Sequence, residues 1–266
     1  MTQLSPKAAE TLERWLQDPL VDEATKEELR ALESDPKELE ERFYRDLEFG
    51  TGGLRGVIGA GSNRINRYTV GRATQGFAKY ILEQHSGGGT PSVVIAHDSR
   101  RFSPEFTLEA ALVLAGNGIK THLFPSLRST PQLSFSVRDL KATGGIVITA
   151  SHNPPEYNGY KVYNSQGGQL IPDEAEKVIS YILQVDSFDA VKRISQEEAE
   201  SQGLLHWLGE NEDEAFTDTV ASVSVAKEEI KSSLGSNFKI VYTPLHGTGN
   251  LPVRSVLSKI GFTEVF

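Results

Sequence analysis

The sequence of 266 residues contains no cysteine. Disulfide bonds and thiol catalysis are therefore excluded within this chain. No apolar run approaches the roughly 18 residues of a membrane-spanning helix, and the first residues lack the apolar core of a secretion signal. These absences lead us to expect a soluble, cytoplasmic protein that has no membrane partner.

Positive charge is in deficit, because 27 Lys and Arg residues face 36 Asp and Glu residues, giving a net charge of −9. This balance argues against nucleic acid or an anionic membrane as the main partner. A small anionic substrate stays compatible with it, since a local cluster of Arg, Lys and backbone N–H groups can hold a phosphate. Nothing in the composition points to an obligate protein partner.

The first 48 residues show helical periodicity, with apolar side chains recurring at steps of three and four. Leu12, Trp15 and Leu16 share one helical face, and leucines continue the pattern as far as Phe43. Asp and Thr residues stand at positions typical of helix caps. We expect residues 1–48 to form a helical arm that packs on the main body.

After the arm, short β-branched runs alternate with helical segments. A strand, a polar turn, a helix and another strand in succession are typical of the crossover unit of a parallel sheet. We therefore expect residues 49–190 to form a three-layer α/β/α sandwich with a mixed, mostly parallel sheet. Its predicted strands include residues 92–96, 119–124, 144–149 and 159–163, and its predicted helices 68–85, 103–115, 131–140 and 172–183.

The strand–turn–helix–strand order of residues 92–124 recurs at residues 238–266, which suggests duplicated α/β domains. Residues 191–211 are rich in charged and polar side chains and are predicted to be a linker. Residues 212–266 would then be the incomplete start of a second α/β domain. Because the sequence stops at Phe266 on what should be a buried strand, we expect a truncated piece of a longer protein.

The residues from Gly145 to Pro155 place a serine and a histidine where a buried strand ends. The β-branched run before them predicts the strand, and Asn153-Pro154-Pro155 cannot continue it. In open α/β sheets, ligands bind at the carboxyl ends of strands. Ser151 and His152, as neighbours on an extended segment, should point to opposite sides, which argues against a hydrolase triad.

A serine at such a loop can still be a nucleophile or a phosphate carrier that surrounding cations activate. Lys161 and Arg55 are the cations best placed by sequence. The simpler alternative is that Ser151 is a turn residue and that His152 is a loop histidine satisfied by the backbone.

Residues 49–61 are too rich in glycine for an ordinary strand interior. Such a segment can bring backbone N–H groups and Arg55 close to an anion. The alternative is a twisted edge strand with bulges. Neither a phosphate-binding Walker loop nor a dinucleotide fingerprint seated between a strand and a helix is present. The glycines lie at positions 50, 52, 53, 56, 59 and 61.

Three motifs in order resemble the α-D-phosphohexomutase superfamily. Thr149-Ala-Ser-His-Asn-Pro154 with Asn158-Gly-Tyr-Lys161 resembles its phosphoserine loop, and Gly50-Thr-Gly-Gly-Leu-Arg-Gly56 its amino-terminal signature. Ala96-His-Asp-Ser-Arg100 is similar to its G-x-D-x-R turn, with Ala96 in place of the glycine. The arm and residues 242–249 resemble the bacterial phosphoglucomutase and phosphomannomutase branch, which has phosphopentomutase-like members. The likeness runs from about Trp15 to Phe266.

This resemblance implies reversible transfer of phosphate between the 1- and 6-positions of glucose phosphate. Phosphate would pass through a phosphoserine and a hexose 1,6-bisphosphate intermediate, with glucose 1,6-bisphosphate as activator and a sugar phosphate as the small-molecule partner. The residues that match the family's catalytic groups are Ser151, His152, Lys161 and Arg55. Those that match its substrate-binding groups are Thr51, Gly52, Asn153, Asn158 and Arg100.

The resemblance also implies Mg²⁺, bound by the phosphoserine oxygen of Ser151 and by aspartates of a D-x-D-x-D-R loop. That loop does not occur here, and Glu212-Asp213-Glu214 has the wrong spacing to replace it. We therefore expect this chain to be inactive and its full-length parent to be a mutase. Phosphomannomutase or phosphopentomutase activity, a non-catalytic sugar-phosphate-binding module and a purely structural domain stay open as alternatives.

Overall fold

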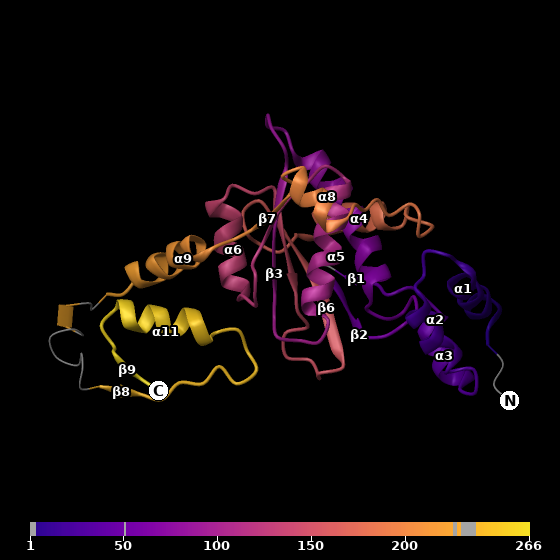
Figure 1. The fold of residues 1–266 in the computed structure, drawn as a ribbon, viewed down its shortest axis with the longest axis horizontal. Helices are drawn as coiled ribbons and strands as arrows, with labels where there is room; N and C mark the ends of the chain where they lie inside the picture. Colours follow the sequence, from indigo (N-terminus) through magenta and orange to yellow (C-terminus); the bar gives the residue numbers. More distant parts are fainter. Residues whose placement is uncertain (1–3, 51, 226–227, 230–237) are drawn as a thin grey trace.

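The structure, a computed structural model, describes residues 4–50, 52–225, 228–229 and 238–266. A seven-stranded sheet forms its centre, in the order β1-β2-β6-β5-β3-β4-β7 (Figure 1). The strands are β1 (Phe49–Gly50), β2 (Gly53–Val57), β3 (Ser92–His97), β4 (Lys120–Leu123), β5 (Gly144–Ile148), β6 (Tyr157–Asn164) and β7 (Leu205–Trp207).

The predicted mixed sheet is confirmed, with β5, β3, β4 and β7 running parallel to one another. The contacts of β1 with β2, β2 with β6 and β6 with β5 are antiparallel. The predicted fold class is therefore confirmed, and the sheet has an antiparallel side that begins at β6. Its cause is the polar loop after β5, which folds β6 back beside β5.

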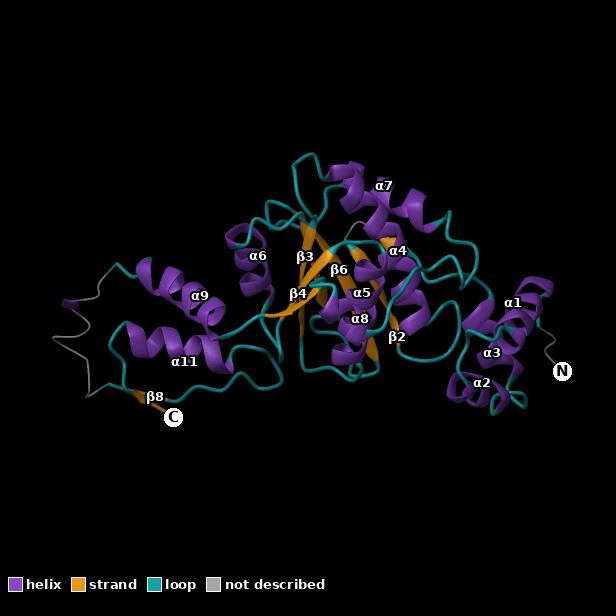
Figure 2. Cartoon of the chain, turned by 45° about the horizontal axis from the view of Figure 1, so that its top comes forward, coloured by secondary structure: helices purple, strands orange, loops and turns teal. Residues whose placement is uncertain are grey.

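Helices cover both faces of the sheet, as the predicted sandwich requires (Figure 2). On one face, α4 (Arg67–Gln84), α5 (Ser103–Gly116) and α7 (Pro172–Ile182) pack on Ile146 and Ile148. On the other face, α6 (Thr130–Asp139) packs on Val147. Because side chains alternate along a strand, the single apolar run of β5 supplies both cores.

The amino-terminal arm holds α1 (Pro6–Gln17), α2 (Glu23–Arg30) and α3 (Pro36–Phe43), which lie at one end of the molecule (Figure 1). Each helix begins after a side chain that accepts a hydrogen bond from a backbone N–H of the first turn. Trp15 anchors the arm, because its ring meets the rings of Phe43, Tyr68 and Phe188 edge to face. Tyr68 belongs to α4, so these contacts join the arm to the sheet domain.

The prediction of a linker at residues 191–211 is wrong. Within it, β7 pairs in parallel with β4 and ends the sheet, and α8 (Gln196–Ser201) packs beside α5. Val191, Ala199 and Leu205 are buried. The segment looked like a linker because each short element buries few side chains and turns its many charged ones to solvent.

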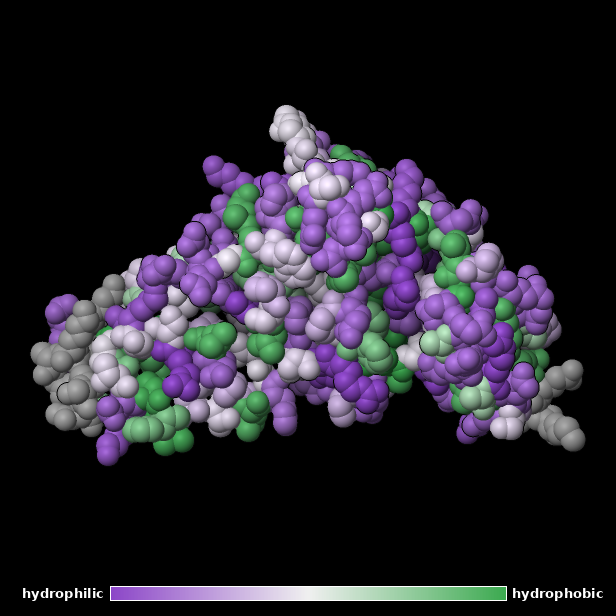
Figure 3. Space-filling model, in the orientation of Figure 1, coloured by the Kyte–Doolittle hydropathy of each residue, from purple (hydrophilic) through white to green (hydrophobic). Residues whose placement is uncertain are grey.

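We call residues 210–266 the carboxy-terminal region. Its elements are α9 (Glu210–Ser222), β8 (Lys239–Ile240), α11 (Asn250–Lys259) and β9 (Glu264–Val265). The predicted strand–helix–strand order at its end is confirmed, with β8 parallel to β9 and α11 packed along α9. Hydrophobic side chains lie on the surface of this region (Figure 3). None of the helices in the described ranges combines the length and apolar character that a membrane crossing requires.

Candidate functional site

Residues 149–156, which we call the serine loop, follow β5 at its carboxyl end. The loop is anchored at its start, where the Thr149 N–H donates to the carbonyl oxygen of Gly159 at 3.0 Å. The Ser151 N–H donates to the Thr149 hydroxyl at 2.9 Å. Ser151 and His152 are both exposed, so the loop presents its reactive side chains to solvent.

The prediction that Ser151 and His152 point to opposite sides is wrong. Ser151 has a φ of 58°, which is the left-handed conformation rather than the extended one. This turn brings the Ser151 hydroxyl within 3.3 Å of His152 Nδ1. The two side chains can therefore exchange a proton directly, although they are adjacent in sequence.

Arg100 holds the serine loop by its main chain. A guanidinium group has five N–H donors. Its Nε lies 3.4 Å from the Asp98 carboxylate, and its terminal nitrogens donate to four carbonyl oxygens. All its donors are thus engaged within the chain, and the role of Arg100 in substrate binding stays a prediction. The carbonyls belong to Ser151 (3.1 Å), Asn153 (2.6 Å), Pro154 (2.8 Å) and Tyr157 (2.9 Å).

Asp98 is a second support that the sequence analysis did not assign to the site. One of its carboxylate oxygens accepts from the Thr149 hydroxyl at 2.6 Å. The other accepts from the backbone N–H of Arg100 at 2.9 Å and from the Ser103 hydroxyl at 3.0 Å. The polar turn after β3 contains both Asp98 and Arg100, and this strand-end position was the available signal.

Asn158 makes its contacts inside the domain. Its side chain is fully buried, and its amide donates to the Arg101 carbonyl and the Ser103 hydroxyl at 3.0 Å each. Its side-chain oxygen accepts from the Gly159 N–H at 2.8 Å. The amide of Asn158 is thus satisfied on both sides within the chain, and its contact with substrate stays a prediction.

Three predicted substrate ligands remain, namely Gly52, Asn153 and Thr51. Gly52 lines a hollow beside the sheet, described below. Asn153 belongs to the serine loop, and its side-chain oxygen is buried without a hydrogen bond to any described residue. Thr51 lies outside the described residues.

Arg55 and Lys161 come together on neighbouring strands. Lys161 of β6 lies opposite Gly53 of β2, and Arg55 lies two residues further along the same face. They line a hollow of about 420 Å³ together with Gly52, Gly53, Leu54, Gln169 and Leu170. Gly53 is required here, because its φ is 139° and a Cβ atom would lie 1.8 Å from the Tyr160 carbonyl oxygen.

The two cations of this hollow are unpaired. No hydrogen bond or ion pair joins the side chain of Arg55 or Lys161 to another described residue. Burial lowers the pKa of Lys161, the nearby charge of Arg55 lowers it further, and Asp98 opposes the shift. Asp98 is thus close enough to Lys161 for their charges to interact. Two unpaired cations facing one hollow favour an anionic ligand.

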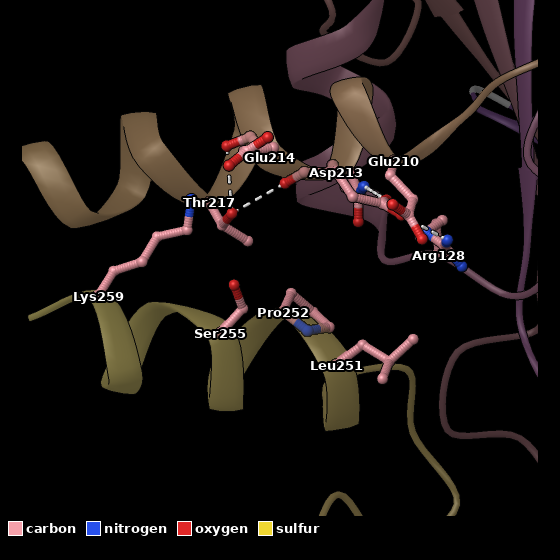
Figure 4. Close-up of a pocket in the computed structure, with 10 residues that line it drawn as sticks. Arg128, Glu210, Asp213, Glu214, Thr217, Leu251, Pro252, Ser255 and Lys259 are labelled. Carbon is pink, nitrogen blue, oxygen red and sulfur yellow. Dashed lines mark hydrogen bonds and ion pairs between the residues drawn. The ribbon is translucent and has the colours of Figure 1, made fainter. Parts of the chain in front are cut away.

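A second pocket, between α9 and α11, has a different character (Figure 4). Its volume is about 300 Å³. Here the cations already have partners: Arg128 contacts Asp213 at 2.7 Å, and Lys259 pairs with Asp218. This pocket therefore lacks the unpaired positive charge that distinguishes the hollow of Arg55 and Lys161.

The described residues do not fit a complete magnesium site. They include no group of three or more His, Asp and Glu side chains placed to hold a metal ion. Mg²⁺ prefers six oxygen ligands in octahedral geometry, and Ser151 offers a single hydroxyl. In the cluster Glu212-Asp213-Glu214, Asp213 is already engaged by Arg128.

Comparison with known proteins places the chain in a family. The model of the phosphoglucomutase/phosphomannomutase α/β/α domain I matches residues 46–189, which hold the sheet strands β1 to β6 and the serine loop. The chain therefore belongs to the phosphoglucomutase/phosphomannomutase family. The expectation drawn from the motifs of the serine loop and the glycine-rich segment is confirmed at this level.

Individual relatives carry the same assignment. The chain is 37% identical over 228 residues to a phosphoglucomutase of Staphylococcus epidermidis, covering 86% of this chain and 40% of the relative. It is 38% identical over 231 residues to a phosphoglucomutase of Staphylococcus haemolyticus, covering 85% and 39%. The chain thus spans about two fifths of the length of these relatives.

Solved structures share the fold. A candidate phosphomannomutase from Thermus thermophilus superposes with a TM-score of 0.66 at 28% identity, covering 83% of this chain and 45% of that one. The open form of the phosphoglucomutase parafusin from Paramecium gives a TM-score of 0.64 at 16% identity, covering 84% and 43%. This second likeness concerns the fold alone.

Proposed function

We propose that this chain carries the phosphate-accepting site of a phosphohexomutase of the phosphoglucomutase type. The observation that carries the proposal is an exposed serine on a rigidly held strand-end loop, together with a hollow of two unpaired cations on β2 and on β6, the strand that anchors the loop. The reaction is reversible transfer of phosphate between the 1- and 6-positions of glucose phosphate, with glucose 1,6-bisphosphate as intermediate.

Each residue of the site has a role in this reaction. In the phosphorylated state, a sugar hydroxyl oxygen bonds to phosphorus while the bond from phosphorus to Ser151 Oγ breaks. The proton of the sugar hydroxyl must then leave, and His152, within 3.3 Å of the serine oxygen, is the group that receives it. Arg55 and Lys161 neutralise the transferred phosphate, since phosphoryl transfer depends mainly on positioning and on charge stabilisation.

We propose that the whole protein binds magnesium. By family resemblance the ion binds the phosphoserine oxygen and aspartates of a D-x-D-x-D-R loop, which this sequence does not contain. When bound, such an ion supplies charge neutralisation at the transferred phosphate. We therefore assign phosphate acceptance and sugar-phosphate binding to this chain and assign no step to the ion.

The sugar is less defined than the phosphate chemistry. Glucose phosphate is favoured because the relatives reported above are phosphoglucomutases. Mannose or pentose phosphates are the alternatives, and they leave the roles of Ser151 and the two cations unchanged. A module that binds sugar phosphate without turnover is the second candidate, and tight binding of glucose 1,6-bisphosphate without metal would favour it.

Phosphate mapping tests the acceptor role of Ser151. The full-length protein is incubated with glucose 1,6-bisphosphate and Mg²⁺, and its phosphorylated residues are located by mass spectrometry. We expect a single phosphate on Ser151, which Ser151→Ala removes. Ser165→Ala is the matched control, because Ser165 is an exposed serine in the turn after β6. Phosphate on another residue, or none on the wild-type chain, contradicts the proposal.

A further inference from the structure

Gln169 lies on a short return segment after β6. The chain turns at residues 164–168 and comes back beside the strand, where the Asn164 N–H donates to the Gly168 carbonyl at 2.8 Å. Gln169 then bridges to Tyr163 in antiparallel fashion. The Leu170 N–H donates to the Val162 carbonyl at 3.4 Å. Backbone pairing thus fixes the position of Gln169 along the edge of β6.

The same part of β6 also holds the glycine-rich segment. The Val162 N–H donates to the carbonyl oxygen of Gly52 at 3.1 Å, so Gly52 and Leu170 both bond to one residue of β6. A Cβ atom added to Gly52 would lie 3.1 Å from Gln169 Nε2. The carboxamide of Gln169 therefore lies against Gly52, and both line the hollow that contains Arg55 and Lys161.

The side chain of Gln169 is available to a ligand. It is exposed, and no hydrogen bond joins its carboxamide to another described residue. No carboxylate of a described residue lines the hollow, so a bound anion meets two cations and one neutral amide. An amide offers two N–H donors and one carbonyl acceptor on a single group. A phosphoryl oxygen can accept from the donors while a sugar hydroxyl donates to the carbonyl.

We propose that Gln169 is a further ligand-positioning residue of this site. Its Nε2 donates to a phosphoryl oxygen held between Arg55 and Lys161, and its Oε1 accepts from a hydroxyl of the same sugar phosphate. The proposal deepens the proposed function and rests on it, because it takes the ligand of the hollow to be a sugar phosphate. It gives the return segment of residues 168–170 a role in recognition.

Calorimetric titration of the 266-residue chain with glucose 1,6-bisphosphate tests this role. We expect Gln169→Ala to weaken binding about three- to tenfold, the usual range for losing one ordinary hydrogen bond. Gln169→Glu should weaken it by more than about tenfold, because a carboxylate would compete with phosphate for the two cations. Gln166→Ala is the matched control, an exposed glutamine of the same turn whose backbone contacts stay intact.

Amide resonances give a readout that a purely structural role would not change. The side-chain N–H signals of Gln169 should shift in proportion to the bisphosphate bound, and those of Gln166 should stay in place. Thermal melting of each variant checks that its fold is intact.

The outcomes separate this proposal from the proposed function. If Arg55→Ala abolishes binding while both Gln169 variants bind like the wild type, the role of Gln169 is overturned and the phosphate site stands. If the wild-type chain does not bind the bisphosphate, both fail together. If the Gln169 and Gln166 variants weaken binding equally, the effect belongs to the turn and the role of Gln169 is again overturned.

Discussion

The helices α5 and α11 occupy the same place in two strand–helix–strand units, yet they differ completely in burial. Nine of the fourteen residues of α5 are buried, whereas α11 buries none of its ten. The strands explain the difference: β3 has a partner on each side, β5 and β4, while β8 pairs with β9 alone among the described residues. A sequence repeat therefore specifies the local strands and helices. Whether these elements are buried depends on how many neighbouring strands the sheet provides.

The apolar side chains of the carboxy-terminal region show the same contrast from outside. Val241 is 86% exposed and Leu251 63%, although their counterparts in the repeat, β3 and α5, are largely buried. These apolar residues follow the sequence pattern of a buried core, yet their side chains are exposed. The consequence is that equal substitutions in the two regions should have unequal effects.

The largest expected effect comes from removing a leucine side chain from each helix. Leu114→Ala in α5 should lower the free energy of unfolding by about 2–5 kcal/mol, because Leu114 is fully buried and a cavity remains. Leu251→Ala in α11, where the side chain is 63% exposed, should change it by less than about 0.5 kcal/mol. Chemical denaturation measures both. Equal losses in the two variants would break the comparison.

An intermediate effect is expected where the two regions meet. Arg128 is almost buried, and its side chain forms two 2.7 Å contacts with Asp213 of α9. Asp213→Ala leaves that cation unpaired and should cost about 1–3 kcal/mol. It should also speed proteolytic cleavage near α9. The exposed pair of Asp218 with Lys259 is the matched control, and Asp218→Ala should cost about 0–1 kcal/mol. Faster cleavage in the control than in Asp213→Ala would reject this assignment.

The smallest expected effect is a pH dependence confined to the sheet domain. Burial, with the charges of Lys120 and His206, lowers the pKa of His122 to about 4. The unfolded chain then binds more protons than the folded one between about pH 6.5 and 4, so stability falls as the pH drops through that window. His122→Gln should remove part of this acid sensitivity. His246→Gln, in the exposed loop of the carboxy-terminal region, should keep it. Melting temperatures at about pH 7 and pH 5, which span part of this window, compare the variants, and identical responses would contradict the prediction.

Local patterns predicted the elements well and their long-range contacts poorly. The β-branched run before the serine loop forms β5, and the predicted return strand forms β6, because periodicity and turn residues act over a few positions. The bonds from Arg100 to the loop join residues more than fifty positions apart, which no local pattern encodes. The hydrogen bonds of Asn158 to Arg101 and Ser103 also join residues more than fifty positions apart, so the sequence pattern did not show them.

Two further misses have conformational causes. The left-handed φ of Ser151 is rare for a residue other than glycine, so a strand-like reading of the segment gave the wrong direction for His152. The three-residue strand β7 was hidden because a short edge strand buries few side chains. Gly52, Arg55 and Lys161, which the sequence analysis named as site residues, line one hollow. Gln169 was missed because an exposed glutamine carries no signal in sequence.

Arg100 holds the serine loop through hydrogen bonds to backbone carbonyl oxygens, and every amino acid has such a carbonyl. The shape of the loop is thus encoded outside the loop, in the turn after β3, while its chemistry is encoded in its own side chains. Such a division lets side chains along the loop be exchanged without redesigning the support beneath them. For protein engineering, the exposed residues Pro155 and Glu156 are the places to introduce new reactive groups beside Ser151, because neither carbonyl is among the four that Arg100 holds.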